Sequence, residues 1–295
     1  MYDFINPLTP ADFNQRIEFL IDDFLPKKLI SMIYADGGMG KSWIAFGIAK
    51  YAAQQAMDVI YLDYDNPISV LKERGIETKL IDAHHNISYS HRSKSKLEPL
   101  AILDEFEKMA IGNRYENTLF IIDSIRNFGN IKNDAEAMRV FDKIMNMREA
   151  GATIVVLHHS TKNGSNYEGS NNIRNSVDNM FQLIKVEAPQ GQIRWLLTVE
   201  KERAAITDTA LSMDIDDLSL TKIDIDSVRL TKDEKDFIKK VQSAISQHED
   251  INKTALLDAC GHKKDDKTAR DKLDKFDGTY WQSEKTKGTF LYRLI

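Results

Sequence analysis

A glycine-rich segment, residues 35–42, holds the residues best suited to chemistry. It reads Ala-Asp-Gly-Gly-Met-Gly-Lys-Ser and fits the pattern of a phosphate-binding loop, with alanine at the usual first glycine. Its glycines let main-chain N–H groups turn towards an anion, and a helix that starts there points its positive end at the same place. Lys41 is expected to neutralise the β- and γ-phosphates, and Ser42 to ligate Mg²⁺. The predicted site for ATP comprises Gly37, Gly38, Met39, Gly40, Lys41, Ser42 and Trp43.

Acidic residues at the ends of two apolar strands supply the carboxylates that such a site needs. Four apolar residues, 119–122, precede Asp123, which is expected to hold the shell of the Mg²⁺. The strand predicted at 59–64 brings Asp63 and then Asp65, either of which could orient and deprotonate a water molecule. Alternation along the strand predicts that both lie on the same side. We prefer Asp65, because ligands bind beyond the carboxyl ends of such strands, although an acid before Asn-Pro also suits a turn.

Two adjacent histidines, His158 and His159, follow another apolar run and precede Ser160-Thr161-Lys162. A histidine at a strand end can donate a hydrogen bond to a γ-phosphate or to an attacking water, and we expect this role in catalysis for His159. A purely structural hydrogen bond is the alternative. Adjacent histidines do not have the spacing of a zinc pair on a helix, and no further ligands lie near them in the sequence, so a zinc site is not expected.

Apolar strands and helices that alternate along the first part of the chain must position these groups. The patterns predict strands at 29–34, 59–64, 119–122 and 153–157, and helices at 41–55, 97–111 and 135–150. This alternation is typical of a mainly parallel sheet covered by helices on both faces, an α/β fold. Beyond Val177, a hairpin and further short strands indicate that the sheet ends in antiparallel strands near residue 228. Residues 1–27 are expected to be a lead-in that packs on this core, which spans 28–228.

Residues 229–295 have a different pattern. Thr231 and Glu234 have the spacing of a capping box, so a first helix is predicted from Thr231 to about residue 247. Two further helices are predicted at 253–259 and at 266–276. Two short strands flank Lys285-Thr286-Lys287-Gly288, so the pattern favours a small winged helix-turn-helix domain. Such a domain can contact DNA or dock a protein, and the sequence leaves both open. The basic residues available for DNA are Lys263, Lys264, Lys267, Arg270, Lys285 and Lys287.

Composition excludes several other classes of protein. The chain has 295 residues, a net charge of -5 and a single cysteine, Cys260, so it forms no internal disulfide. It has no apolar run long enough for a transmembrane helix and no secretory signal pattern, and we expect a cytoplasmic protein with no membrane partner. The charge argues against a globally basic nucleic-acid binder. Residues 251–295, however, hold ten basic and seven acidic residues, a net of +3, which leaves -8 for residues 1–250.

Several segments in order along residues 15–205 carry a family resemblance. They are Phe-Leu-Ile-Asp-Asp-Phe-Leu-Pro at 19–26, Tyr-Leu-Asp-Tyr-Asp-Asn-Pro at 61–67, His-His-Ser-Thr-Lys at 158–162, Tyr-Glu-Gly-Ser at 167–170 with Asp178, and Lys-Glu-Arg at 201–203. Together they resemble RecA-like hexameric ATPases, specifically the RepA-type replicative helicases. The sequence departs from that family's pattern at Asp65, where glutamate is usual, and at Glu168, where arginine is common.

The resemblance implies a RecA-like P-loop core in a ring hexamer, which hydrolyses ATP at subunit interfaces around single-stranded DNA. It identifies Asp65 as the catalytic carboxylate. It also implies that Lys201 and Arg203 reach the γ-phosphate bound by a neighbouring subunit, although two charges on an alternating strand can simply face solvent. Loops after the third and fourth core strands, here 124–134 and 161–176, are expected to face DNA or to be ordinary surface loops. Their basic residues are Arg126, Lys132, Lys162 and Arg174.

The function predicted from these features is an ATP hydrolase that moves along or unwinds DNA. The resemblance alone implies its setting, the replication of a plasmid, phage or other mobile element, with replication proteins as further partners. Two rivals are kept. A recombination mediator on the same core would form filaments on single-stranded DNA. A DNA-binding regulator would use the nucleotide as a switch with little turnover, which the aspartate at position 65 keeps open.

Overall fold

The computed structural model describes residues 7–14, 16–161, 167–248, 250–286 and 288–295, and the chain divides into two units. The larger unit ends at Ile225 and the smaller begins at Asp226, whereas the sequence patterns predict a boundary between residues 228 and 229. Each unit has hydrophobic core residues of its own. Within the described ranges, no helix combines the length and the apolar character needed to cross a membrane.

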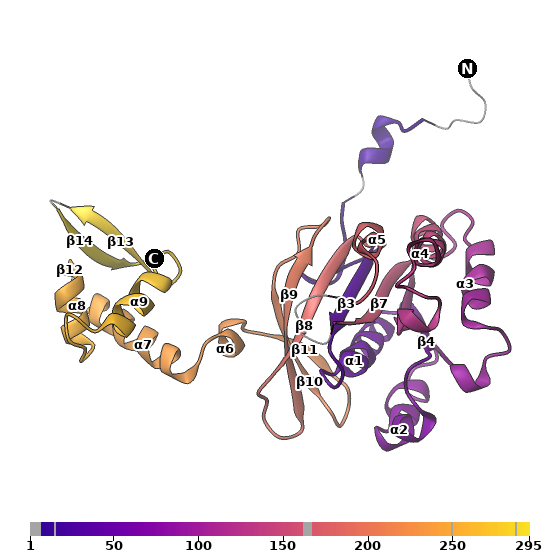
Figure 1. Cartoon of the computed structure of the whole chain (residues 1–295), viewed down its shortest axis with the longest axis horizontal. Helices are drawn as coiled ribbons and strands as arrows, with labels where there is room; N and C mark the ends of the chain where they lie inside the picture. Colours follow the sequence, from indigo (N-terminus) through magenta and orange to yellow (C-terminus); the bar gives the residue numbers. More distant parts are fainter. Residues whose placement is uncertain (1–6, 15, 162–166, 249, 287) are drawn as a thin grey trace. The chain divides into compact units, whose positions relative to one another are not determined.

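A nine-stranded sheet forms the centre of the larger unit (Figure 1). Across the sheet the order is β11 (Leu220–Ile223), β10 (Thr209–Asp214), β9 (Gln192–Lys201), β8 (Asn179–Val186), β3 (Ile30–Ala35), β7 (Thr153–His159), β6 (Thr118–Asp123), β4 (Asp58–Asp63) and β5 (Ile87–His91). The strands from β8 to β5 are parallel, and β9, β10 and β11 extend the sheet in antiparallel fashion. This mostly parallel sheet with its helices confirms the predicted α/β class.

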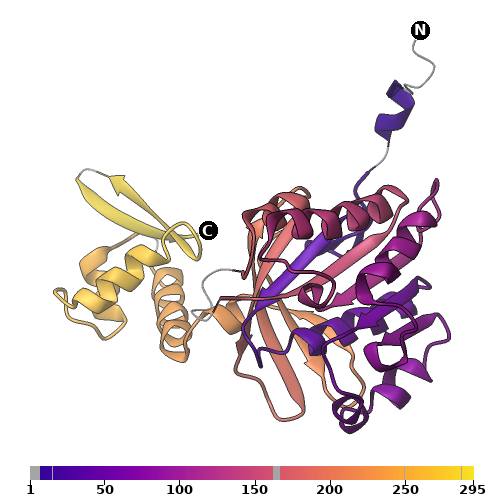
Figure 2. The ribbon, with the colours of Figure 1, turned by 45° about the vertical axis from the view of Figure 1, so that its right-hand side comes forward.

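Alternate residues of the central strands pack against helices on opposite faces of the sheet. In β6, Leu119 belongs to the core on the side of α1, whereas Phe120 belongs to the core on the side of α4. Figures 1 and 2 show these helices on the two sides of the sheet. Because both faces are covered, the central strands β3, β6 and β7 are buried along almost their whole length and are mostly apolar. The α-helices described in this unit are α1 (Lys41–Gln54), α2 (Ile68–Glu73), α3 (Pro99–Lys108), α4 (Asp134–Glu149) and α5 (Asn171–Ser176).

Parallel pairing brings the ends of four strands to one edge of the sheet. Ala35, the last residue of β3, pairs with His159 of β7, and Asp63 of β4 pairs with Asp123 of β6. Strand β7 lies between β3 and β6. The glycine-rich loop, the histidine and the acids therefore share the edge at which ligands bind in such sheets.

Some elements escaped the sequence patterns. Strand β5, Ile-Ser-Tyr-Ser-His, is too polar to predict and lies at the edge of the sheet. Two short strands, β1 (Phe19–Ile21) and β2 (Leu25–Pro26), form a separate antiparallel pair. Phe24, between the two strands, and Leu25, the first residue of β2, are fully buried and belong to the core beside α1. This part of the chain is therefore attached to the larger unit.

The smaller unit consists of short helices and an antiparallel sheet in the order β12-β14-β13. The capping box expected at Thr231 and Glu234 is present at the start of α7. Trp281 is fully buried in the core of this unit, and its Nε1 donates to the main-chain oxygen of Leu273 at 3.1 Å. The elements are α6 (Asp226–Arg229), α7 (Lys232–Ser246), β12 (Ile251–Asn252), α8 (Lys253–Ala259), α9 (Lys267–Lys275), β13 (Trp281–Thr286) and β14 (Thr289–Leu294).

Candidate nucleotide site

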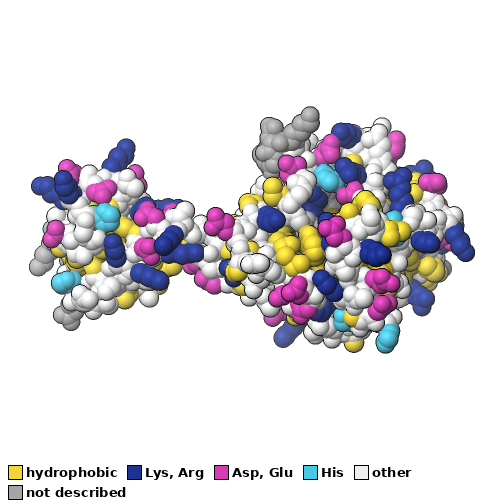
Figure 3. All heavy atoms as spheres, turned by 90° about the horizontal axis from the view of Figure 1, so that it is seen from below, with side chains coloured by type: hydrophobic (Ala, Val, Ile, Leu, Met, Phe, Trp, Pro, Cys, Tyr) yellow, Lys and Arg dark blue, Asp and Glu magenta, His cyan; other side chains and the backbone are white. Residues whose placement is uncertain are grey.

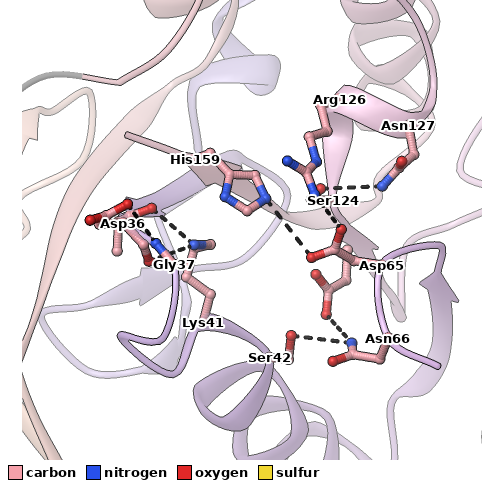
Figure 4. A network of polar contacts seen from close by, with 12 residues as sticks. Asp36, Gly37, Lys41, Ser42, Asp65, Asn66, Ser124, Arg126, Asn127 and His159 are labelled. Carbon is pink, nitrogen blue, oxygen red and sulfur yellow. Dashed lines mark hydrogen bonds and ion pairs between the residues drawn. The ribbon is translucent and has the colours of Figure 1, made fainter. Parts of the chain in front are cut away.

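The loop between β3 and α1 presents main-chain groups at the edge of the sheet (Figure 4). Gly38 and Gly40 have φ angles of +77° and +90°, which residues with a side chain rarely adopt. Lys41 begins α1, and its Nζ donates hydrogen bonds to the main-chain oxygens of Ala35 at 2.9 Å and of Asp36 at 3.0 Å. Burial lowers the pKa of Lys41, and nearby carboxylates oppose that shift. The lysine is therefore held against the loop that the sequence predicts to bind phosphates.

A tryptophan from the antiparallel part of the sheet supports this loop. Trp195 of β9 is fully buried, and its Nε1 donates to the main-chain oxygen of Met39 at 2.8 Å. A Cβ atom on Gly40 would lie 3.1 Å from the same nitrogen, so the indole and the loop are in close contact. Sequence reasoning missed Trp195, because an apolar strand gives no sign of which loop its side chains support.

Asp123 and Ser42 supply oxygen atoms that suit a divalent cation. Asp123 is 1% exposed and accepts hydrogen bonds from the hydroxyl of Tyr61 at 3.1 Å and from the amide of Asn66 at 3.2 Å, and the same amide nitrogen lies 3.2 Å from Oγ of Ser42. Burial, with the negative charge of Asp63, raises the pKa of Asp123 to about 7. A hydroxyl and a carboxylate oxygen side by side are the ligands that Mg²⁺ prefers, so the residues present fit that ion.

Asp63 and Asp65 have different surroundings, and the expectation that they share one side of a strand is wrong. Strand β4 ends at Asp63, so alternation does not extend to Asp65. Asp63 is fully buried and accepts hydrogen bonds from the main-chain N–H groups of Asp65 at 3.1 Å and Asn66 at 3.0 Å and from the hydroxyl of Tyr89. It turns the chain out of the sheet, which is the turn role that aspartate often has.

Asp65 lies between the side chains of Arg126 and His159 at the open end of the site (Figure 4). Its Oδ1 is 2.9 Å from a guanidinium nitrogen of Arg126, and its Oδ2 is 3.8 Å from Nε2 of His159. That histidine nitrogen is buried and has no hydrogen-bond partner among the described residues. Burial, reinforced by the positive charges of Lys41 and Arg126, lowers the pKa of His159 and favours its neutral form. The arrangement leaves Nε2 available for a ligand at this edge.

His158 points to a different partner. Its Nε2 is hydrogen bonded to the main-chain oxygen of Glu168, and its side chain is fully buried. Burial lowers the pKa of His158 to about 4, so it is neutral at physiological pH. Because side chains alternate along β7, His158 has a structural role in the core, whereas His159 faces the site.

The residues expected to contact DNA occupy several positions. Arg126 belongs to the turn Ile125–Asn127 and reaches into the nucleotide site. Lys132 forms an ion pair at 2.6 Å with Glu168, so the two predicted loops are joined. Arg174 is exposed and donates to the main-chain oxygen of Glu200 at 2.8 Å; it lies on α5, which occupies part of the segment predicted as a loop. Lys162 lies outside the described residues.

Lys201 and Arg203 lie beside the beginning of β8, whereas the glycine-rich loop follows the end of β3. Nζ of Lys201 donates to the main-chain oxygens of Arg174 at 2.6 Å and Val177 at 2.7 Å. Arg203 pairs with the buried carboxylate of Asp178 at 2.9 Å, and its side chain is 55% exposed. The two residues are therefore separated from the phosphate loop of their own chain.

Comparison with known proteins adds a family match. A model of a family described as an AAA domain matches residues 11–165, more than half of the chain. None of the curated proteins compared with the chain matches it. Among solved structures, a crystal structure of the RadB recombinase is similar, with 16% sequence identity and a TM-score of 0.48 over 68% of this chain and 93% of that one.

Proposed function

The chain belongs to the AAA domain family, and from this premise we propose that its larger unit is a RecA-like P-loop ATPase and that the protein is an ATP-driven DNA translocase or helicase. From the resemblance to RepA-type helicases, its proposed setting is the replication of a plasmid, phage or other mobile element, alongside other replication proteins. The observation that carries the proposal is the ion pair between Asp65 and Arg126, because it joins the nucleotide site to a loop expected to face DNA.

The proposed reaction is hydrolysis of ATP at the edge of the sheet. Main-chain N–H groups of the loop and the ammonium group of Lys41 would offset the charge of the phosphates. Ser42 and Asp123 would hold Mg²⁺, which neutralises charge on the β- and γ-phosphates when bound. Asp65, whose side chain is 27% exposed, can contact water and would act as the general base. His159 would hydrogen bond the γ-phosphate or the attacking water through Nε2.

Arg126 provides a route from this reaction to the DNA-facing loops. It lies in the turn that follows β6 directly, so a change at Asp65 alters the start of the segment 124–134. The ion pair of Lys132 with Glu168, and a hydrogen bond from the main-chain N–H of Ser170 to the oxygen of Ile131 at 3.1 Å, connect that segment to the next loop. Switching loops in this way is a common use of nucleotide binding.

Lys201 and Arg203 support an assembly in which neighbouring subunits share a site. They lie away from the phosphate loop of their own chain, and cations supplied by a neighbour would stabilise charge in the transition state. Arg203 is well exposed, as a residue that reaches another subunit must be. We propose a homo-oligomer, by resemblance a hexamer, with single-stranded DNA in its channel.

The smaller unit is proposed to be a winged helix that adds contacts to DNA. Its helices, followed by the β13–β14 hairpin, are consistent with that fold, and its net charge is positive over residues 251–295. On the face seen in Figure 3, basic and acidic side chains are interspersed over each unit. Attraction for DNA must therefore come from local groups such as Lys263 and Lys264, and docking of a protein is the alternative use.

An ATPase assay with single-stranded DNA as titrant tests the proposal. We expect turnover that DNA stimulates, that Lys41→Ala abolishes and that Lys108→Ala, a change at an exposed surface lysine, leaves intact. Strand displacement from a forked duplex then separates a helicase from a translocase, and electron microscopy with DNA separates rings from filaments. Absence of DNA stimulation in protein that hydrolyses ATP would contradict the DNA role.

A nucleotide-switched regulator is the second candidate, and the same ion pair favours it. Arg126 pairs with Oδ1 of Asp65, so the ion pair would occupy one of the two carboxylate oxygens of the proposed general base and would restrain turnover. Tight binding of ATP without hydrolysis, at any DNA concentration, would support the switch against the motor.

A further inference from the structure

The side-chain amide of Asn66 occupies the position between the oxygens that suit a cation. Its Nδ2 lies 3.2 Å from Oγ of Ser42, 3.2 Å from Oδ2 of Asp123, and 3.1 Å from both carboxylate oxygens of Asp63. Figure 4 shows Asn66 beside Ser42 at the foot of the site. An amide nitrogen has only two hydrogens, so four oxygen atoms exceed what it can satisfy. This nitrogen therefore sits in a shell of oxygens with the composition of a divalent-cation site.

The orientation of this amide is determined by a second contact. Oδ1 of Asn66 accepts a hydrogen bond from a guanidinium nitrogen of Arg74 at 3.2 Å. Since a guanidinium group can only donate, the oxygen must face Arg74 and the nitrogen must face the carboxylates. The main-chain oxygen of the same asparagine is 2.7 Å from Nε2 of His91, at the end of β5. Asn66 is therefore held from two sides in the position that it occupies.

The charges around Nδ2 explain why an amide is useful there. Asp63 and Asp123 are both almost fully buried, and two carboxylates at close range repel each other. The partly positive hydrogens of the amide offset some of that repulsion, as a cation would do more strongly. The amide and a divalent ion consequently compete for Ser42 and Asp123.

We propose that Asn66 is a positioning residue that takes the place of the divalent cation and must leave Ser42 and Asp123 when the cation binds with a nucleoside triphosphate. The inference rests on the proposed function, because it assumes that the site binds Mg·ATP. The displaced side chain carries its contact with Arg74, which follows α2 directly and lies 5.0 Å over the ring of Trp43. Cation binding is thereby linked to the position of α2, which borders the site beside the phosphate loop.

Cation affinity, measured apart from hydrolysis, tests this inference. Mn²⁺ serves as the probe and is titrated in the presence of a non-hydrolysable ATP analogue, with free Mn²⁺ followed by electron paramagnetic resonance. Asn66→Ala removes the competing amide, so Mn²⁺ should bind about tenfold more tightly, the change expected for the loss of one or two hydrogen bonds that the ion would otherwise have to break. Asn66→Ser is the second variant, in case the alanine protein does not fold.

Asn127→Ala is the matched control. Its amide lies at the same edge of the sheet but contacts Oγ of Ser124 at 3.4 Å, outside the cation shell, so its Mn²⁺ affinity should equal that of the wild type. Unchanged or weaker Mn²⁺ binding in both Asn66 variants would overturn the inference. Weaker binding would identify Asn66 as a ligand of the ion. If the wild type binds no ATP analogue at all with Mn²⁺ or Mg²⁺, the proposed function itself fails, and this outcome is distinct from the other.

Discussion

Trp195 and Met39, 156 positions apart in the sequence, are joined by a hydrogen bond of 2.8 Å from the indole nitrogen to the main-chain oxygen. The contact ties an antiparallel strand to the phosphate loop, which otherwise carries few side chains to hold its shape. A loop whose conformation exists before the ligand arrives loses less entropy on binding. The antiparallel strands thus contribute to the nucleotide site, although no sequence motif of the site lies on them.

Trp195→Phe should weaken nucleotide binding as well as stability. The change leaves the oxygen of Met39 without its buried donor, which costs about 1–3 kcal/mol in the free energy of unfolding of the larger unit. Affinity for a fluorescent ATP analogue should fall several-fold. Trp281→Phe is the control, because Trp281 is equally buried and also donates to a main-chain oxygen, but in the smaller unit. Equal effects of both variants on ATP affinity would contradict the role of Trp195 in the loop.

Gly40→Ala and Gly37→Ala should differ in their effect on stability. At Gly40 a Cβ atom meets the Trp195 ring at 3.1 Å and the φ angle is +90°, so strain of about 1–3 kcal/mol is expected. At Gly37 nothing lies within 4 Å and the φ angle is not in the left-handed range, so the free energy of unfolding should change little. Urea denaturation of the two variants measures the difference, and equal destabilisation would contradict the strain at Gly40.

Asp65→Asn should separate binding from hydrolysis. The amide keeps the size of the side chain but cannot accept the proton of water, so kcat should fall by about 10²–10⁴-fold. The affinity for ATP should stay within a few-fold of the wild type, because Asp65 lies at the mouth and not in the loop. Steady-state turnover and analogue binding are measured on the same preparation, with Asp22→Asn, at an exposed position between β1 and β2, as the control. Full activity in Asp65→Asn would transfer the base role to another residue.

Arg126→Gln should alter the dependence of turnover on DNA. Removing the guanidinium frees Oδ1 of Asp65, which is 2.9 Å away, so basal turnover should rise while stimulation by single-stranded DNA declines. Arg114→Gln is the control, because Arg114 is exposed and precedes the start of β6, whereas the turn with Arg126 follows the end of that strand. A variant with reduced basal turnover and unchanged DNA stimulation would show that Arg126 assists the chemistry and does not restrain it.

The titration of Asp123 predicts a pH dependence of stability in the absence of cations. Its pKa is raised from 3.8 to about 7, so between these values the folded protein holds a proton that the unfolded chain has lost. The contribution of this carboxyl to the free energy of unfolding is greatest below this interval and declines as the pH rises through it, by at most about 1.4 kcal/mol per pH unit. Asp123→Asn removes this decline.

Urea denaturation in EDTA is measured between about pH 5 and about pH 8, a range that covers the upper part of the titration of Asp123. The stability of Asp123→Asn relative to the wild type should increase with pH and level off above about pH 7. The pKa of His158 is lowered to about 4, so its contribution to the free energy of unfolding is lost as the pH falls towards that value. This contribution is the same in the wild type and in Asp123→Asn, so it cancels in the difference between them. A difference that does not vary with pH would contradict the raised pKa of Asp123.

The sequence by itself determined the features that depend on neighbours along the chain. The apolar run 119–122 predicted a buried strand, and the capping-box spacing of Thr231 and Glu234 predicted a helix start that the structure contains. The glycines of the loop 35–42 predicted main-chain conformations that only glycine tolerates, and Gly38 and Gly40 adopt them. Such signals are local, because hydrophobic periodicity, capping and φ angles are properties of a few consecutive residues.

Only the tertiary structure decided which groups meet at the site. Arg126 reaches Asp65 across 61 positions, and Asn66 reaches Ser42 across 24, because strand order and register bring the ends of separate strands together. The division between a buried Asp63 and an accessible Asp65 follows from the point at which β4 ends, where the Asp63 carboxylate captures main-chain N–H groups instead of continuing the sheet. Periodicity cannot predict that end, because it is set by hydrogen bonds that exist only in the folded edge of the sheet.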